Sequence, residues 1–173
     1  MNRTTAAPLS ALLALGALAG CVTQPDETAD SAERISYQRG PCFGSCPVFS
    51  VEIDASGQGT YRGERFVAVR GERQFTATPA QVRAFEQRLA PYRPASDVAY
   101  NHGNCDGPMA TDQAAVAISW GDPAGDGTVL EWNTGCRQPG LAENREAIMT
   151  AWRELPLDDL VGTAEDRFQY DRD

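Results

Sequence analysis

The chain contains no lysine and only one histidine, His102. Its basic residues are 15 arginines against 24 aspartates and glutamates, which gives a formal net charge of −9 and a pI near 4.6. Binding nucleic acid requires a basic face for the phosphates. The charge balance therefore argues against a nucleic-acid partner and against attraction to anionic lipid head groups. An acidic surface serves solubility.

Motifs of common enzyme classes are also missing. The sequence has no Gly-x-Ser-x-Gly segment and no His-Glu-x-x-His pair. Any Ser-His-Asp triad or Cys-His dyad would have to use His102, the only histidine of the chain. We therefore predict a non-enzymatic protein with no catalytic residues and no cofactor.

No apolar run near the N-terminus is long enough to span a membrane. The stretch from Leu9 to Ala19 is shorter than the about 20 apolar residues of a transmembrane helix, and Pro8 and Ser10 interrupt it. Arg3 at the start and small residues before Cys21 instead predict a secretory signal peptide over residues 1–20. An uncleaved anchor is the alternative.

The segment Leu18-Ala19-Gly20-Cys21 resembles a bacterial lipoprotein signal. The resemblance implies that Cys21 becomes the lipidated first residue of the mature protein and anchors it to a membrane. By resemblance to enterobacterial sorting, Val22 after the anchor implies the outer membrane, with the protein facing the periplasm. The expected location is the bacterial cell envelope.

The mature chain has the length of one compact domain. Residues 21–33 are polar and acidic and are predicted to form a flexible tether. Residues 34–162 are predicted to form a single domain, and residues 163–173 a charged C-terminal tail.

Hydrophobic patterns predict an α+β fold. Alternation predicts strands from Ile35, over Phe49 to Asp54, Thr60 to Val69 and Gln74 to Thr76, and over Val116 to Trp120 and Thr128 to Trp132. Helices are predicted after a capping box at Thr78 and from Leu141 to Leu155. Residues 95–111 are expected to be a loop. We predict an antiparallel sheet packed on two helices, in the order hairpin, helix, hairpin, helix.

Four cysteines remain once Cys21 is set aside, and an even count in an exported chain predicts disulfides. Three pairings are possible. We favour Cys42–Cys46, which closes a small ring worth about 2 kcal/mol, and Cys105–Cys136, which closes a longer loop worth about 3–4 kcal/mol.

The stretch Arg-Gly-Pro-Cys-Phe-Gly-Ser-Cys-Pro at residues 39–47 looks like the signature of a bacterial family of domains of unknown function, often found in lipoproteins. In that family a Cys-Phe-Gly-x-Cys-Pro segment precedes a strand. Residues 57–63 and the pair Thr111-Asp112 resemble later parts of the family pattern. The resemblance covers roughly residues 35–160 and implies no established activity.

The two close cysteines have two interpretations. One is a stapled loop in which Gly44 allows a tight turn and Pro47 fixes the exit. The other is thiol chemistry, because two thiolates could bind Cu(I) or exchange with a disulfide. The Cys-x-x-x-Cys-Pro spacing resembles the copper-binding motif of the Sco copper chaperones, which implies His102 as a third ligand beside Cys42 and Cys46. In those proteins a helix follows the motif, whereas here a strand is predicted.

Two functions follow from these observations. The leading hypothesis is an envelope lipoprotein that binds a protein partner or another envelope component, through the sheet or the loop around His102. The alternative is a thiol–disulfide or copper-handling protein that uses Cys42 and Cys46.

Overall fold

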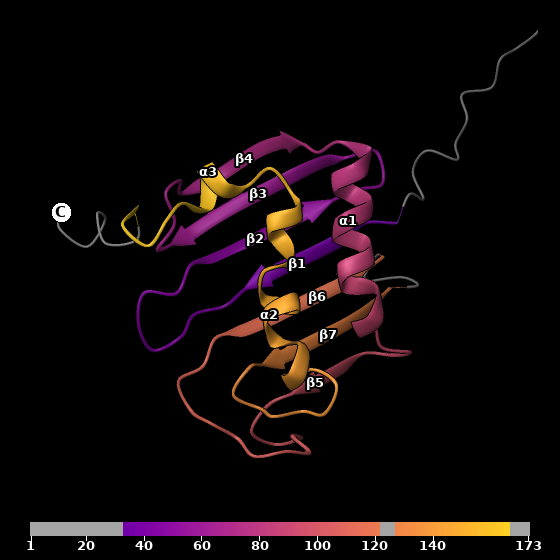
Figure 1. Ribbon diagram of the computed structural model, residues 1–173, viewed down its shortest axis with the longest axis vertical. Helices are drawn as coiled ribbons and strands as arrows, with labels where there is room; N and C mark the ends of the chain where they lie inside the picture. Colours follow the sequence, from indigo (N-terminus) through magenta and orange to yellow (C-terminus); the bar gives the residue numbers. More distant parts are fainter. Residues whose placement is uncertain (1–32, 122–126, 167–173) are drawn as a thin grey trace, which may run out of the picture.

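The computed structural model describes residues 33–121 and 127–166 (Figure 1). The predicted signal peptide, the lipidation of Cys21 and the tether up to residue 32 lie outside the described residues. So do residues 122–126, between the predicted strands that end at Trp120 and begin at Thr128, and residues 167–173 of the predicted tail.

A seven-stranded sheet forms the described domain, in the order β4-β3-β2-β1-β6-β7-β5. All neighbouring strands are antiparallel except β5 and β7, which are parallel. The strands are β1 (Ile35–Arg39), β2 (Val48–Ile53), β3 (Gln58–Arg65), β4 (Gly71–Thr76), β5 (Val98–Tyr100), β6 (Ala115–Trp120) and β7 (Thr128–Asn133). The predicted α+β class is confirmed, and the sheet is mixed.

Strand β1 lies at the centre of the sheet and pairs with β2 on one side and with β6 on the other. Tyr37 pairs with Val51 on β2 and with Ile118 on β6, and all three are buried. Side chains one residue away point to the other face, as the two-residue period of a strand requires. The register therefore places one continuous apolar face of the sheet toward the core.

Two strand predictions are corrected by the structure. Strand β3 ends at Arg65 and does not continue to Val69, because Phe66 has a positive φ of 55° that breaks the extended backbone. Residues 95–111 are not all loop, because Val98–Tyr100 forms β5 beside β7. A three-residue strand is too short to show alternation, and its partner lies more than 25 residues away in sequence.

Helix α1 (Pro79–Leu89) begins as its sequence predicts. The Thr78 side chain accepts a hydrogen bond from the backbone N–H of Gln81, and the Gln81 side chain accepts one from the backbone N–H of Thr78. Its apolar positions Val82, Phe85 and Leu89 are buried. Phe85 meets Tyr37 edge to face, with ring centroids 6.2 Å apart.

The predicted helix from Leu141 to Leu155 is wrong, because this segment is divided. It consists of η3 (Ala142–Asn144), α2 (Arg145–Met149) and η4 (Ala151–Glu154), and α3 (Asp158–Val161) follows. The Tyr37 hydroxyl has one proton to donate, and it lies 3.1 Å from the carbonyl oxygens of both Ile148 and Met149. The Met149 carbonyl also accepts a hydrogen bond from Arg39, so side chains of β1 contact the backbone where α2 ends.

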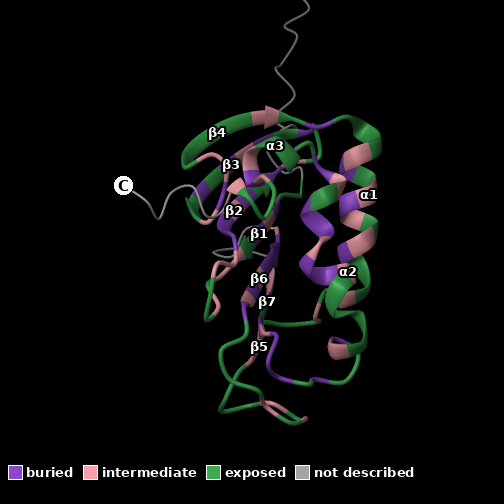
Figure 2. Ribbon diagram, turned by 60° about the vertical axis from the view of Figure 1, so that its left-hand side comes forward, coloured by how far each residue is buried: buried purple, intermediate pink, exposed green. Residues whose placement is uncertain are grey.

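The helices cover one face of the sheet, so the domain has two layers (Figure 2). Phe49 of β2 and Trp152 of η4 meet edge to face across the interface, 5.6 Å apart. The predicted order of hairpin, helix, hairpin, helix is corrected, because four strands precede α1, and three further strands lie between α1 and the divided helical segment. No helix covers the other face among the residues that the structure describes (Figure 1).

Candidate functional site

The loop between β1 and β2, residues 40–47, is the site on which the sequence analysis concentrates. A disulfide joins Cys42 and Cys46, whose Cα atoms are 5.8 Å apart. Gly44 adopts a φ of 135°, a conformation that residues with a Cβ rarely adopt. The Phe43 N–H donates to the Asp112 carbonyl at 3.1 Å, and the Gly40 N–H donates to the Ala115 carbonyl at 2.9 Å. The loop is thus closed on itself and fixed to the segment that leads into β6.

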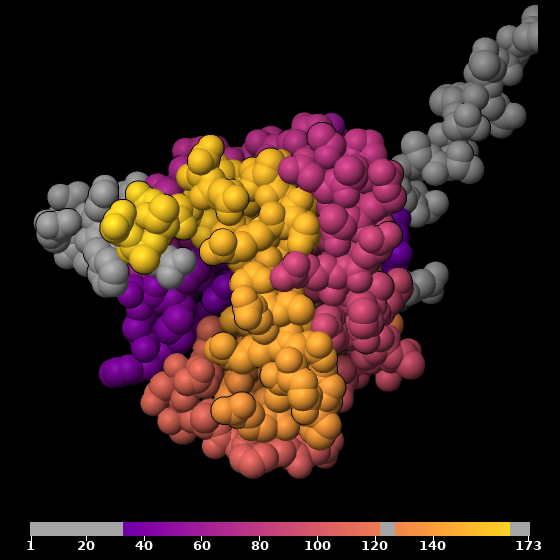
Figure 3. Space-filling model, in the orientation of Figure 1, coloured from indigo at the N-terminus to yellow at the C-terminus, as the bar shows by residue number. Residues whose placement is uncertain are grey.

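Phe43 projects from this fixed loop into solvent. Its side chain is 87% exposed, and no other large hydrophobic side chain among the described residues is exposed. The space-filling view shows the indigo segment of this loop at the margin of the molecule, next to the orange segment that precedes β6 (Figure 3). A single exposed apolar residue is common on protein surfaces. Here, however, the backbone that presents it is held by a covalent bond and by hydrogen bonds.

A hollow of about 400 Å³ lies beside the loop. Its lining carries two arginines and no acidic residue, in a chain whose net charge is −9. We call it the loop hollow, and it is lined by Arg39, Cys42, Phe43, Gly44, Ser45, Cys46, Pro47, Thr150, Trp152 and Arg153.

Trp152 and Arg153 supply the side of the loop hollow that comes from η4. The Arg153 guanidinium carbon lies over the Trp152 ring, 5.1 Å from its centroid, which is a cation–π contact. The Trp152 side chain is buried, and its Nε1 has no hydrogen-bond partner among the described residues. Leaving a buried N–H unpaired costs about 1–3 kcal/mol. Arg39, another lining residue, donates through Nη1 to the Met149 carbonyl at 3.0 Å.

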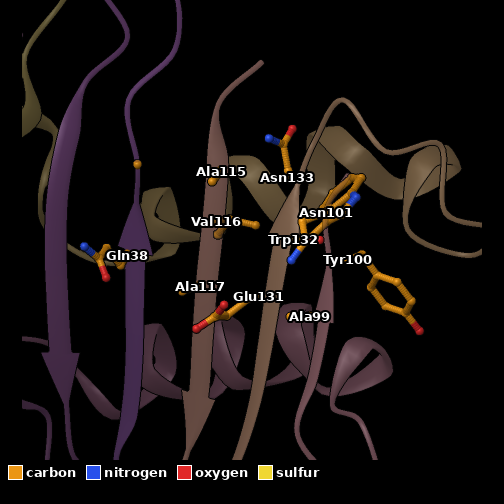
Figure 4. Close-up of a pocket in the computed structure, with 11 residues that line it drawn as sticks. Gln38, Ala99, Tyr100, Asn101, Ala115, Val116, Ala117, Glu131, Trp132 and Asn133 are labelled. Atoms are coloured by element: carbon orange, nitrogen blue, oxygen red, sulfur yellow. The ribbon is translucent and has the colours of Figure 1, made fainter. Parts of the chain in front are cut away.

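A second hollow, of about 330 Å³, lies on the open face of the sheet (Figure 4). It follows β6, where Ala115 and Ala117 present small side chains between the longer Gln38 of β1 and Glu131 of β7. Ala117 pairs with both of these neighbours, so the three residues form one row across the sheet. We call this hollow the β6 trough. Its lining includes a few polar side chains, but no two of them form a pair that could act in catalysis.

His102 lies apart from the cysteine loop in the chain and is exposed in a turn. The Asn101 N–H donates to the Asn104 side-chain oxygen at 2.9 Å and shapes this turn. The disulfide Cys105–Cys136, with Cα atoms 5.7 Å apart, fixes the following loop to the end of β7. The two disulfides are the pairings that the sequence analysis favours.

The structure does not assemble the metal ligands that the Sco resemblance implies. Within residues 33–121 and 127–166, no three His, Cys, Asp or Glu side chains gather in a way that could hold a metal ion. Cys42 and Cys46 are bonded to each other, and His102 does not join them. No described helix is long and apolar enough to cross a membrane.

Sequence reasoning missed the roles of Phe43, Trp152 and Arg153. The sequence contained an indication of the role of Phe43, because a large apolar residue lies between two cysteines that close a short loop. Trp152 is buried. Trp152 and Arg153 line the same hollow as a loop more than 100 residues earlier, and no pattern in the sequence indicates this arrangement.

Comparison with known proteins places the chain in a family. The family described as "Domain of unknown function (DUF6438)" matches residues 33–151. No curated protein and no solved structure matches the chain. The matched range contains both disulfides and the β6 trough, and it ends just before Trp152 and Arg153 of the loop hollow. Because the match spans more than half of the chain, the protein belongs to the DUF6438 family.

Proposed function

We propose that this protein is a lipid-anchored, non-enzymatic binding module of the bacterial cell envelope, and that it holds a partner protein through Phe43. The observation that carries the proposal is the 87% exposure of this side chain on a loop closed by a disulfide. Aromatic side chains are enriched among the residues that dominate protein interfaces. A loop that is already rigid loses little conformational freedom on binding, so more of the contact energy appears as affinity.

The position in the envelope rests on the sequence. Residues 1–20 have the features of a signal peptide, and the Leu-Ala-Gly-Cys segment supports Cys21 as the lipidated residue. Disulfides persist in oxidising compartments such as the periplasm, and the described domain has two. We place the domain in the periplasm, on the outer membrane, at the end of the tether.

The mass of protein taken directly from bacterial envelopes, with free thiols trapped by alkylation, tests this placement. We expect a mature N-terminal peptide that begins at an acylated Cys21, and no alkylated thiol on Cys42 or Cys46. An unmodified Cys21 would contradict the anchor. Alkylated Cys42 and Cys46 would instead favour thiol or copper handling, because both reactions need the free thiolates.

Photo-crosslinking in intact envelopes tests the role of Phe43. A photoreactive phenylalanine analogue at position 43 is expected to give a discrete adduct with a partner protein, since the side chain already points outward. The matched control carries the same analogue at Gln87, an exposed position on α1. The absence of an adduct at position 43, or identical adducts at both positions, would rule out a contact through Phe43.

A further inference from the structure

Strand β4 is an edge strand with one free side. Its six residues, Gly71–Thr76, pair with β3 in an unbroken register, and no strand lies beyond it within residues 33–121 and 127–166. Two ribbon views show β4 at the margin of the sheet (Figure 1, Figure 2). Five of its six residues are exposed, and it contains no proline. Such an edge offers unpaired N–H and C=O groups to another strand.

The ladder between β3 and β4 shows which backbone groups point to the free side. The Ala77 N–H donates to the Gly57 carbonyl at 2.8 Å, in line with the register of the two strands. Hydrogen-bonded pairs alternate along an antiparallel ladder, so every second residue counted back from Ala77 bonds to β3. The residues between them, Glu72, Gln74 and Thr76, therefore turn their backbone N–H and C=O groups away from β3.

The opposite edge of the sheet is protected. Strand β5 has only three residues, and the Ala99 carbonyl on it accepts a hydrogen bond from the Asn104 side chain. Short edge strands, covering loops and edge charges are the usual means by which proteins prevent sheets from joining. On β4 the Glu72 carboxylate is neutralised by Arg62 of β3, at 2.7 Å. Of the two edges of the described sheet, β4 is thus the one prepared to accept a strand.

The side chains of β4 are complementary to a second copy of the same strand. Two identical strands pair antiparallel about a two-fold axis, and we place this axis at Gln74. Glu72 then lies opposite Thr76 of the other copy, and both turn backbone groups outward. Arg73 lies opposite Phe75, so that no two like charges meet. A guanidinium group opposite an aromatic ring is a favourable cross-strand pair.

The neighbouring registers are less favourable. An axis at Arg73 places two guanidinium groups directly opposite each other, and an axis at Glu72 does the same with two carboxylates. Like charges directly opposite on paired strands are destabilising. An axis at Phe75 avoids both but shortens the paired stretch to residues 74–76. Charge and length together select the axis at Gln74.

We infer that two copies of this protein join through β4, antiparallel and centred on Gln74, into one sheet that runs through both domains. Each hydrogen-bonded pair exchanges two backbone bonds. Arg73 Nη1, which donates to the Glu72 carbonyl of its own strand, gives up this bond, and the carbonyl bonds to the other copy. The pairing uses both free edges, so the assembly closes at two copies.

The net charge of the protein is compatible with this contact. The whole chain carries −9, which makes two copies repel each other at long range. Strand β4 carries one glutamate and one arginine, so the contact itself brings no excess charge together. Salt at physiological strength screens more distant charges within about 8 Å. The inference is separate from the proposed contact through Phe43, which lies on the β1–β2 loop.

Cysteine cross-linking of the full chain in intact envelopes tests the register. In Gln74→Cys the two Cα atoms of the dimer lie about 5.5 Å apart, which a disulfide can span. We expect a disulfide-linked dimer on a non-reducing gel. The matched control is Glu72→Cys, exposed on the same strand, whose two copies are offset by about 13 Å along the strands and should not cross-link. Expressing Glu72→Cys together with Thr76→Cys should restore the cross-link.

Two further variants test the contact without added thiols. Gln74→Pro removes an N–H that points outward and leaves the bonds to β3 in place, as proline on an edge strand allows. The mass of the full-length, lipidated protein in detergent is expected to fall from that of a dimer to that of a monomer. Thr76→Glu places a carboxylate opposite Glu72 and should raise the Kd of the dimer about fivefold, whereas Thr76→Gln should leave it unchanged.

Three results would overturn the inference. One is a Gln74→Cys protein that gives no cross-linked dimer, or one that cross-links no better than Glu72→Cys. The second is a folded Gln74→Pro protein that remains a dimer. The third is a disulfide adduct of Gln74→Cys with a different protein, which would assign the edge of β4 to another occupant.

Discussion

Replacing both cysteines of the second disulfide, as Cys105→Ser and Cys136→Ser, is expected to lower the free energy of unfolding by about 3–4 kcal/mol. The bond closes a loop with a sequence separation of 31, so its loss releases a large amount of chain entropy in the unfolded state. Domains of this size are stable by only about 5–15 kcal/mol, so the variant would lose a large share of its margin.

The contacts around the bond indicate where the domain would loosen. Cys136 is fully buried and pairs with Met109 in an isolated β-bridge, and the Ala110 N–H donates to the Gly135 carbonyl at 2.9 Å. The loop that carries His102 is thus attached to the end of β7 by backbone contacts and one covalent bond. Without the bond, this loop should exchange its amide hydrogens faster than α1 does.

Urea unfolding followed by tryptophan fluorescence measures the loss. The matched control is the pair Cys42→Ser and Cys46→Ser, which opens a ring with a sequence separation of only 4. Loop entropy assigns that ring about 2 kcal/mol, so its removal should cost about 1.5 kcal/mol less. An equal or larger loss from the short ring would contradict the loop-length argument.

The second large effect is expected from Trp132→Ala, at about 3–5 kcal/mol of unfolding free energy. Trp132 is 1% exposed on β7, where it pairs with Val116 of β6 and Tyr100 of β5. Truncation removes the buried ring, leaves a cavity beneath the β6 trough, and takes away the donor that engages the Cys136 carbonyl. The variant loses packing and a buried hydrogen bond together.

Trp132→Phe separates these two contributions. Phenylalanine keeps an apolar ring in the core but has no N–H, so the Cys136 carbonyl loses its donor. We expect this variant to lose less free energy of unfolding than Trp132→Ala, as measured by urea denaturation under identical conditions. If both variants lost the same amount, the hydrogen bond would outweigh the packing, and the argument from burial would be wrong.

Local patterns in the sequence predicted the elements whose shape is decided locally. Alternation located β1, β2, β6 and β7, and the capping box at Thr78 located the start of α1. The division of the second helix was not predictable in this way. Where the helix divides, the Tyr37 hydroxyl lies within hydrogen-bond distance of the carbonyls of Ile148 and Met149, which are 111 and 112 residues away in the sequence.

In the candidate site, too, the features set by local sequence were predictable, and those set by distant parts of the chain were not. The favoured cysteine pairing came from composition and spacing, because four cysteines allow few combinations. The loop hollow is lined by the β1–β2 loop and by Trp152 and Arg153 of η4, which lie far apart in the sequence. Thr150, just before η4, has a φ of −112° and donates through its hydroxyl to the Glu146 carbonyl at 2.7 Å. Only the folded chain shows that these residues line one hollow.

The central position of β1 determines how this domain would carry a mechanical load. In the proposed arrangement, a membrane anchor pulls on the chain ahead of Ile35, and a partner pulls on Phe43 just beyond Arg39. Tension between the two points runs along the covalent backbone of a strand that is already nearly fully extended. The hydrogen-bond ladders to β2 and β6 lie beside this line of force and do not have to transmit it. The envelope could therefore stretch the link between membrane and partner without unfolding the domain.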